Sequence, residues 1–246
     1  GGAAFDNLLS ATAIEANASG VYIGANANVP SILERKSFVV SSVSETAQTA
    51  YGFFIASGAT APSINNSGSI TAQLFGEIGN ATAIVDNSNT LASITNSGTL
   101  IAQITQTDSD PNDSIPPPAI TGTATAIDVS ASSINVTLNQ NATSPFTDDD
   151  AVDNDAAIVP AVTIIGDIRF GSGNDIFNLN AGTATGALSF GAGTDAFNIA
   201  GGAVYTGRLS DSDGQLTVNV GTGTANLTGG AANITSANFG SGAVVT

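Results

Sequence analysis

The chain has 246 residues, of which only 10% are charged, and its formal net charge is −16. Nucleic-acid binding needs clustered Lys and Arg, and the chain has only 4 such residues, so a nucleic-acid partner is excluded. The absence of His and Cys also excludes a Ser-His-Asp relay, a Cys-His dyad, disulfides, and zinc sites built on imidazole or thiolate ligands.

The first segment of the chain, residues 1–19, is expected to form a cap or a lead-in to the rest. Within it, Leu9, Ala13 and Ile14 have helical spacing, which predicts a short helix within residues 5–16. Helix is not expected elsewhere, because the strong helix formers Lys, Arg and Glu are scarce.

The second segment, residues 20–160, repeats itself at intervals of about 30 residues. Each repeat holds short stretches in which apolar residues alternate with polar ones, as at Ile70, Ala72 and Leu74. Alternation of this kind, punctuated by Gly, Asn and Ser, is typical of β-strands. The matching positions are Ile32 and Ile64 at an offset of 32, Ile64 and Ile94 at an offset of 30, and residues 81–84 and 124–127 at an offset of 43.

Two inserts lengthen the second segment, one at residues 106–120 and one at about 142–158. They do not fit the repeat and are expected to project from it as loops. The first contains three Pro residues at 116–118, which favour a stiff spacer, with a partner-binding loop as the alternative. The second carries five Asp residues within 148–155, which favour a solvated loop, with a cation site as the alternative.

The third segment, residues 161–246, has a shorter repeat. Residues 170–179 return as residues 190–199 at an offset of 20, and a weaker copy follows through Leu216 and Val218 at an offset near 21. A repeat of 20 to 32 residues made of short strands is long enough for one coil of a parallel β-solenoid. In such a fold the inward residues of stacked coils form one continuous core. The predicted fold is therefore a single, elongated, all-β parallel β-helix.

The turns between the strands agree with this prediction. Asn-Ser-Gly stands at residues 66–68 and again at 96–98. Asn and Gly tolerate the left-handed backbone of tight turns, and stacked copies allow Asn amides to form ladders.

Two Gly-x-Gly-x-Asp turns in the third segment supply the candidate binding residues. They resemble half of the repeats-in-toxin calcium motif, in which glycines let the backbone surround Ca²⁺ and Asp supplies carboxylate oxygen. The alternative is a structural turn, in which Gly takes a positive φ and Asp accepts backbone N–H bonds. The residues are Gly171, Gly173 and Asp175 in the first turn, and Gly191, Gly193 and Asp195 in the second.

Catalysis is not expected, and no residue is assigned a catalytic role. Asp175 and Asp195 could meet the separation of roughly 5 to 9.5 Å that glycoside hydrolases need between two carboxylates. A polysaccharide lyase usually needs a basic group as well, and the regular coils of the third segment contain only Arg169 and Arg208.

Several stretches resemble the passenger domains of Gram-negative type V autotransporters. Residues 83–88, Ala-Ile-Val-Asp-Asn-Ser, followed by the Ile-Thr-Asn-Ser-Gly-Thr-Leu of residues 94–100, are similar to passenger repeats. The two Phe-Gly-x-Gly-x-Asp-x-Phe-Asn copies are similar to the distal passenger coils, and residues 209–246 resemble the region just before the membrane barrel. The resemblance implies a right-handed β-helix that a C-terminal barrel exports through the outer membrane. No protease or lipase head is recognisable.

The function expected from these observations is a non-enzymatic, extracellular or surface-bound shaft with a structural or adhesive role. Its expected partners are its own barrel in the precursor, a surface glycan or cell receptor, and further copies of the chain stacked end to end into filaments. One alternative is a calcium-stabilised surface-layer or adhesin module. Another is a carbohydrate-active β-helix enzyme.

Overall fold

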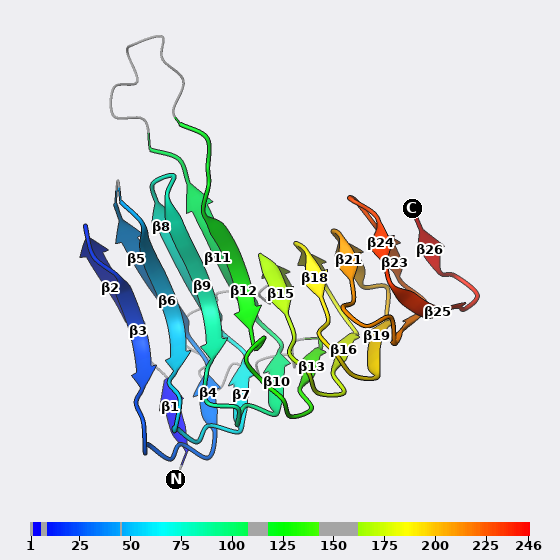
Figure 1. Cartoon of the computed structure of the whole chain (residues 1–246), viewed down its shortest axis with the longest axis horizontal. Helices are drawn as coiled ribbons and strands as arrows, with labels where there is room; N and C mark the ends of the chain where they lie inside the picture. The colour runs from blue at the N-terminus through cyan, green and yellow to red at the C-terminus, as the bar shows by residue number, and fades with distance from the viewer. Residues whose placement is uncertain (1, 6–8, 45, 108–117, 143–161) are drawn as a thin grey trace, which may run out of the picture.

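The computed structural model describes residues 2–5, 9–44, 46–107, 118–142 and 162–246. Within them the chain forms strands and no helix, and the strands stack in sequence order into three parallel sheets (Figure 1). Each of the first eight coils gives one strand to each sheet, and the last coil, β25 and β26, gives one strand to each of the two nine-stranded sheets. The chain is therefore a right-handed parallel β-helix, and the predicted fold class is confirmed.

The three sheets, here called A, B and C, run along the length of the molecule. Sheet A consists of β1 (Ala3–Phe5), β4 (Ile32–Glu34), β7 (Ser63–Asn66), β10 (Ser93–Asn96), β13 (Thr137–Gln140), β16 (Ile176–Leu179), β19 (Asp195–Ile199), β22 (Leu216–Val220) and β25 (Ile234–Phe239). Sheet B consists of β2 (Leu9–Ile14), β5 (Ser37–Val43), β8 (Ser69–Phe75), β11 (Thr99–Thr105), β14 (Thr163–Ile165), β17 (Thr183–Thr185), β20 (Val204–Thr206), β23 (Thr224–Asn226) and β26 (Val244–Val245). Sheet C consists of β3 (Ala18–Ile23), β6 (Gln48–Ile55), β9 (Gly79–Asp86), β12 (Thr123–Asp128), β15 (Asp167–Arg169), β18 (Leu188–Ser189), β21 (Leu209–Ser210) and β24 (Ala231–Ala232).

The register between coils follows the offsets read from the sequence. Ile64 pairs with both Ile32 and Ile94 in sheet A, and Phe177 pairs with Phe197. The offset of 43 is also correct, because residues 81–84 of β9 pair with residues 124–127 of β12. The recurring blocks are therefore successive coils of one solenoid.

The helix expected within residues 5–16 is wrong. The described residues up to Ile14 lie in β1 and β2, residues 15 and 16 form a bend, and β2 pairs with β5. Leu9, Ala11 and Ala13 alternate with polar residues and pair with residues 38, 40 and 42 of β5, so their period is that of a strand. Residues 1–19 contribute β1, β2 and the start of β3 to the first coil. Most of the two inserts at 106–120 and 142–158 lies outside the described residues.

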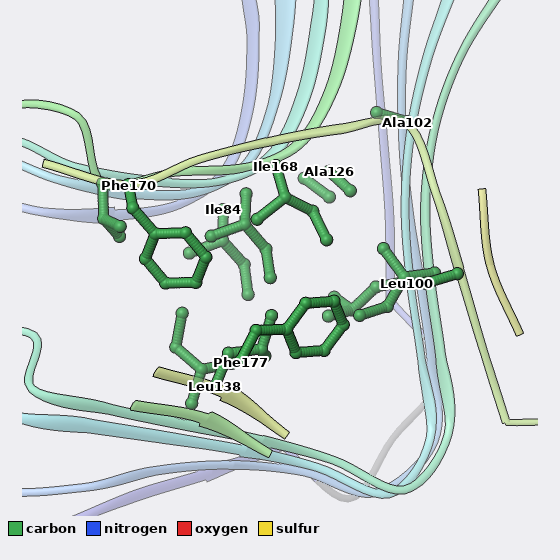
Figure 2. Close-up of a cluster of buried hydrophobic side chains, with 14 of the residues drawn as sticks. Ile84, Leu100, Ala102, Ala126, Leu138, Ile168, Phe170 and Phe177 are labelled. Atoms are coloured by element: carbon green, nitrogen blue, oxygen red, sulfur yellow. The ribbon is translucent and has the colours of Figure 1, made fainter. Parts of the chain in front are cut away.

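The interior is an apolar column to which all three sheets contribute (Figure 2). Phe177 from sheet A, Leu100 from sheet B and Ile84 from sheet C are completely buried and point toward one another. Successive coils stack like on like, and the rings of Phe177 and Phe197 are parallel with centroids 5.1 Å apart. Each fully buried side chain of this size contributes about 1.5 to 3 kcal/mol.

A polar column runs beside the apolar one at the corner between sheets A and B. Glu34, Asn66, Asn96 and Gln140 end four successive strands of sheet A, and all four are buried. Asn66 Nδ2 donates to Asn96 Oδ1 over 2.8 Å, and Asn96 Nδ2 donates to Gln140 Oε1 over 3.4 Å. The backbone N–H of Gly98 donates to Asn96 Oδ1 over 3.3 Å, which closes the turn. The amide ladder expected at the Asn-Ser-Gly turns is confirmed.

A second amide ladder lies on the outer face of sheet A. In each step the Nδ2 atom of one Asn donates to the Oδ1 atom of the Asn one coil earlier, over 2.7 to 2.8 Å. Its members are Asn139, Asn178, Asn198, Asn219 and Asn238.

Candidate functional site

The two Gly-x-Gly-x-Asp turns lie one above the other at the start of neighbouring strands of sheet A. Asp175 directly precedes β16, and Asp195 is the first residue of β19. Both side chains point into the molecule, with 0% of Asp175 and 1% of Asp195 exposed. The structure therefore brings the two predicted carboxyl groups together, but it places them inside the coils.

Each carboxyl group binds the backbone of the coil before it. Asp175 Oδ1 accepts the N–H of Val136 over 2.7 Å, and Asp195 Oδ1 accepts the N–H of Asp175 over 2.7 Å. The side chains thus take the place of backbone carbonyls as acceptors between coils. This is the arrangement expected of a structural turn.

The glycines of these turns are required by the close approach of successive coils. A Cβ atom at Gly191 would lie 1.6 Å from the carbonyl oxygen of Gly171, and one at Gly173 would lie 2.2 Å from that of Ile134. Gly193 also has a φ of 138°, a conformation that other residues rarely adopt. The Gly-x-Gly pattern is explained by packing without any bound ion.

Burial changes the acidity of both groups. It raises the pKa of Asp175 above its ordinary value, even though the N–H of Val136 acts in the opposite direction. The pKa of Asp195 is raised to about 6, mainly by burial and also by the negative charges of Asp175, Asp211 and Asp213, while the N–H of Asp175 acts in the opposite direction. The second oxygen, Oδ2, of both Asp175 and Asp195 is buried and has no hydrogen-bond partner in the described part of the chain.

The calcium site expected at Asp175 and Asp195 remains a prediction. Among the described residues, no group of three or more acidic side chains is arranged to hold a metal ion. The acidic stretch within 148–155 lies outside those residues. Thermal unfolding in excess EGTA tests the prediction directly, because bound calcium would stabilise the folded chain. An unchanged melting temperature would exclude it.

A glycosidase mechanism needs carboxyl groups that touch the sugar. Asp175 and Asp195 are too deeply buried for this, and their Oδ1 atoms already accept backbone N–H groups. Asp175 and Asp195 are therefore not placed to act as the two carboxylates of a glycoside hydrolase, although their spacing in the sequence allowed it.

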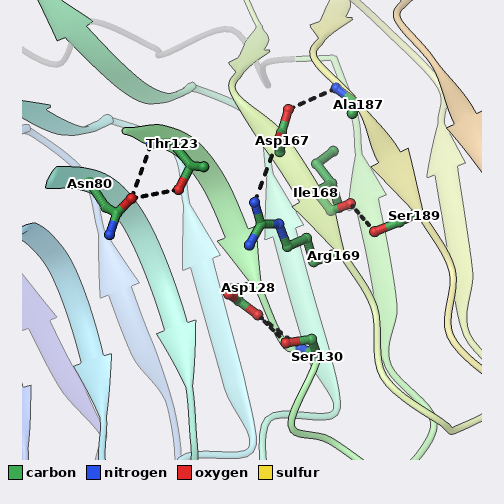
Figure 3. A network of polar contacts seen from close by, with 9 residues as sticks. All are labelled: Asn80, Thr123, Asp128, Ser130, Asp167, Ile168, Arg169, Ala187 and Ser189. Carbon is green, nitrogen blue, oxygen red and sulfur yellow. Dashed lines mark hydrogen bonds and ion pairs between the residues drawn. The ribbon is translucent and has the colours of Figure 1, made fainter. Parts of the chain in front are cut away.

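Three partly exposed charged side chains, Asp128, Asp167 and Arg169, lie on the outer face of sheet C (Figure 3). Arg169 Nη2 lies 3.6 Å from Asp167 Oδ2, and Asp167 also accepts the N–H of Ala187 over 2.9 Å. On the neighbouring β12, Asp128 accepts the hydroxyl of Ser130 over 2.6 Å. These contacts are pairs and turn contacts on an open surface, where an ion pair contributes about 0 to 1 kcal/mol.

Two surface features went unnoticed in the sequence. Tyr22 is 64% exposed on sheet C and stacks on Phe54, with ring centroids 5.4 Å apart, and Tyr51 meets Phe54 edge to face. The offset of 32 between Tyr22 and Phe54, the same as that between Ile32 and Ile64, could have predicted that the two rings stack on neighbouring coils. The other feature is an apolar pocket in the last coils, whose lining includes Leu209, Val218, Ile234 and Phe239.

No helix in the described part of the chain is long and apolar enough to cross a membrane. Comparison of the chain with family models, with curated proteins and with solved structures finds no match.

Proposed function

We propose that the chain is a non-enzymatic structural and adhesive shaft, displayed on or released from the surface of a Gram-negative cell. The observation that carries this proposal is the neutral outer face of sheets A and B. The strands of these two sheets contain only two charged residues, Glu34 and Asp195, and both are buried. Ser, Thr, Asn and β-branched residues cover the rest of this surface. A long neutral surface suits many weak contacts along its length better than a reaction at one point.

Export as an autotransporter passenger is part of the proposal. The support is the resemblance of the repeats, together with the β-helical fold that the resemblance implied. In this proposal a membrane barrel follows the shaft in the precursor. Fusion of the chain to such a barrel in a Gram-negative host tests this. Protease added to intact cells should remove the chain, whereas a chain that becomes accessible only after lysis contradicts the proposal.

Adhesion to a surface glycan or cell receptor is tested with beads that carry the purified chain. We expect these beads to be retained on cells or extracellular matrix more strongly than beads coated with albumin. A double variant, Thr185→Lys and Thr206→Lys, places two charges on the outer face of sheet B and should reduce retention. The matched variant Asp128→Asn on sheet C should not. Equal retention of chain-coated and albumin-coated beads would contradict an adhesive role.

Stacking of copies into filaments is the remaining part of the proposal. The edge strands at both ends of the stack leave backbone groups that another copy could bind. The strand lengths limit head-to-tail pairing, because β2 and β3 have six residues each, whereas β26 and β24 have two. Electron microscopy of the purified chain distinguishes filaments from rods of single-molecule length.

A further inference from the structure

The Asp175 and Asp195 carboxyl groups form a buried pair whose hydrogen-bonding capacity is only partly used. Oδ1 of Asp175 accepts the N–H of Val136 and Oδ1 of Asp195 accepts that of Asp175, and the backbone of Gly171 also lowers the pKa of Asp175. The Oδ2 atom of each group is buried without a hydrogen-bond partner in the described part of the chain. An ionised carboxylate has about four lone-pair sites to satisfy, and burying such a charge without partners is strongly unfavourable. Something must neutralise the pair when the coils are folded.

The described surroundings of the pair supply no positive charge. Toward β13 the pair meets the backbone of Val136, and the charged groups that act on Asp195 are Asp175, Asp211 and Asp213, all of them acidic. Among the residues that the structure describes, no basic side chain acts on either carboxyl group. Two neighbouring carboxylates of like charge also disfavour each other's ionisation. A neutralising ion pair within the coil is therefore ruled out for the described residues.

We propose that Asp175 and Asp195 form a proton-binding site, which makes the coils of the third segment more stable in mildly acidic than in neutral solution. A proton on Oδ2 removes the buried charge and leaves Oδ1 able to accept the backbone N–H of the preceding coil. The hydrogen bonds between coils therefore survive protonation. The site is independent of the adhesive role proposed above.

The direction of the pH effect follows from the acidity of the folded and unfolded states. Burial raises the pKa of Asp195 to about 6 in the folded chain, against about 3.9 for Asp in an unfolded chain. Between these values the folded state binds the proton more tightly, so lowering the pH favours folding. The added stability is complete below about pH 4 and is lost as the pH rises through about 6.

The first experiment titrates the Asp carboxyl carbons of the isotope-labelled wild-type chain by NMR. We expect one carboxyl signal to shift with a midpoint near pH 6, and this signal should be missing from the spectrum of Asp195→Asn. The measurement needs no destabilised variant, because the wild-type chain carries the signal. If every Asp carboxyl titrates at or below about pH 4, the ordinary range for this residue, the proposal is wrong.

The second experiment compares denaturant unfolding at pH 5 and pH 7.5. We expect the denaturant concentration at the wild-type unfolding midpoint to be lower at pH 7.5 than at pH 5. The decrease should be smaller for Asp195→Asn, because Asn cannot bind the proton. Asp128→Asn, which removes an exposed charge from sheet C, controls for net charge and should keep the wild-type fall. An equal fall in the wild type and Asp195→Asn overturns the proposal. The proposal is also overturned if added Ca²⁺ raises the unfolding midpoint of the wild type at pH 7.5 but not that of Asp195→Asn. Such a result would mean that a metal ion, and not a proton, neutralises the site.

Discussion

The coils before β13 and the coils after it enclose their interiors with strands of different length. In sheet B the strands β5, β8 and β11 have seven residues each, whereas β14, β17 and β20 have three. Figure 1 shows the solenoid narrow accordingly toward the C-terminal end. We call these two parts the wide coils, β1–β12, and the narrow coils, β14–β26.

The interior changes with the width. In the wide coils the corner between sheets A and B holds Glu34, Asn66 and Asn96, and the column continues into Gln140 of β13. In the narrow coils the same column continues as Leu179, Ile199 and Val220. A coil with long strands surrounds a polar ladder with enough apolar area to tolerate it, whereas at this corner the shorter coils use the inward position for an apolar side chain. The narrow coils instead carry their amide ladder outside, on sheet A.

The strongest test of this comparison is loss of a large ring from a narrow coil. Phe197 is completely buried, stacks on Phe177 at 5.1 Å and meets Tyr205 edge to face at 5.2 Å. We expect Phe197→Ala to lower the free energy of unfolding by about 3 to 5 kcal/mol, because the cavity remains after the ring is lost. Urea unfolding followed by circular dichroism measures the change. Phe54→Ala, on the outer face of sheet C, is the control, and equal losses would mean that the narrow core is not tightly packed.

An intermediate effect is expected from the inner amide ladder. Asn96→Ala removes one of the two acceptors of Asn66 Nδ2 and leaves the buried N–H of Gly98 without its side-chain partner. Leaving a buried polar group unsatisfied costs about 1 to 3 kcal/mol. The same unfolding measurement applies. A loss below 0.5 kcal/mol, on the order of a surface substitution, would show that water enters the corner and replaces the amide.

The smallest effect is expected from the outer amide ladder. Asn198 donates to Asn178 over 2.8 Å and accepts from Asn219 over 2.7 Å, but its side chain is only partly buried. In Asn198→Ala, water can replace both contacts, so we expect a loss of about 0.5 to 1 kcal/mol. Both variants remove amide hydrogen bonds, but only Asn96 is fully buried. The difference between their losses in free energy of unfolding therefore measures the effect of burial on such a contact. A larger loss for Asn198→Ala would reverse the order that the comparison predicts.

The repeat offsets were the most informative feature of the sequence. Ile64, Ile94, Phe177 and Phe197 predicted the parallel coils and their register because inward residues of a solenoid must stack on their equivalents. The helix at residues 5–16 was predicted wrongly because Leu9 and Ala13 fit both a helical period and strand alternation, whereas Ile14 lies on the opposite, exposed face of β2. Only pairing with β5 decides between them.

The sequence was less informative about the candidate site. Asp175 and Asp195 were recognised as equivalent, but a Gly-x-Gly-x-Asp turn can point its carboxyl group toward an ion or toward the neighbouring backbone. The orientation depends on how closely the preceding coil approaches, and in this chain Asp175 Oδ1 faces the N–H of Val136 over 2.7 Å. A spacing of residues along the chain carries no information about that distance.

Equivalence between coils also bears on how the length of the molecule can vary. In β16 and β19 a residue and its partner 20 positions later occupy the same place in the sheet, as Phe177 and Phe197 do. Deleting residues 176–195 would join Asp175 to Ala196. The new Asp-Ala bond would match the bond between Asp195 and Ala196 in the intact chain. Each remaining coil would meet a neighbour much like the one it lost. The shaft can therefore be shortened or extended by whole turns through deletion or duplication, with its cross-section unchanged.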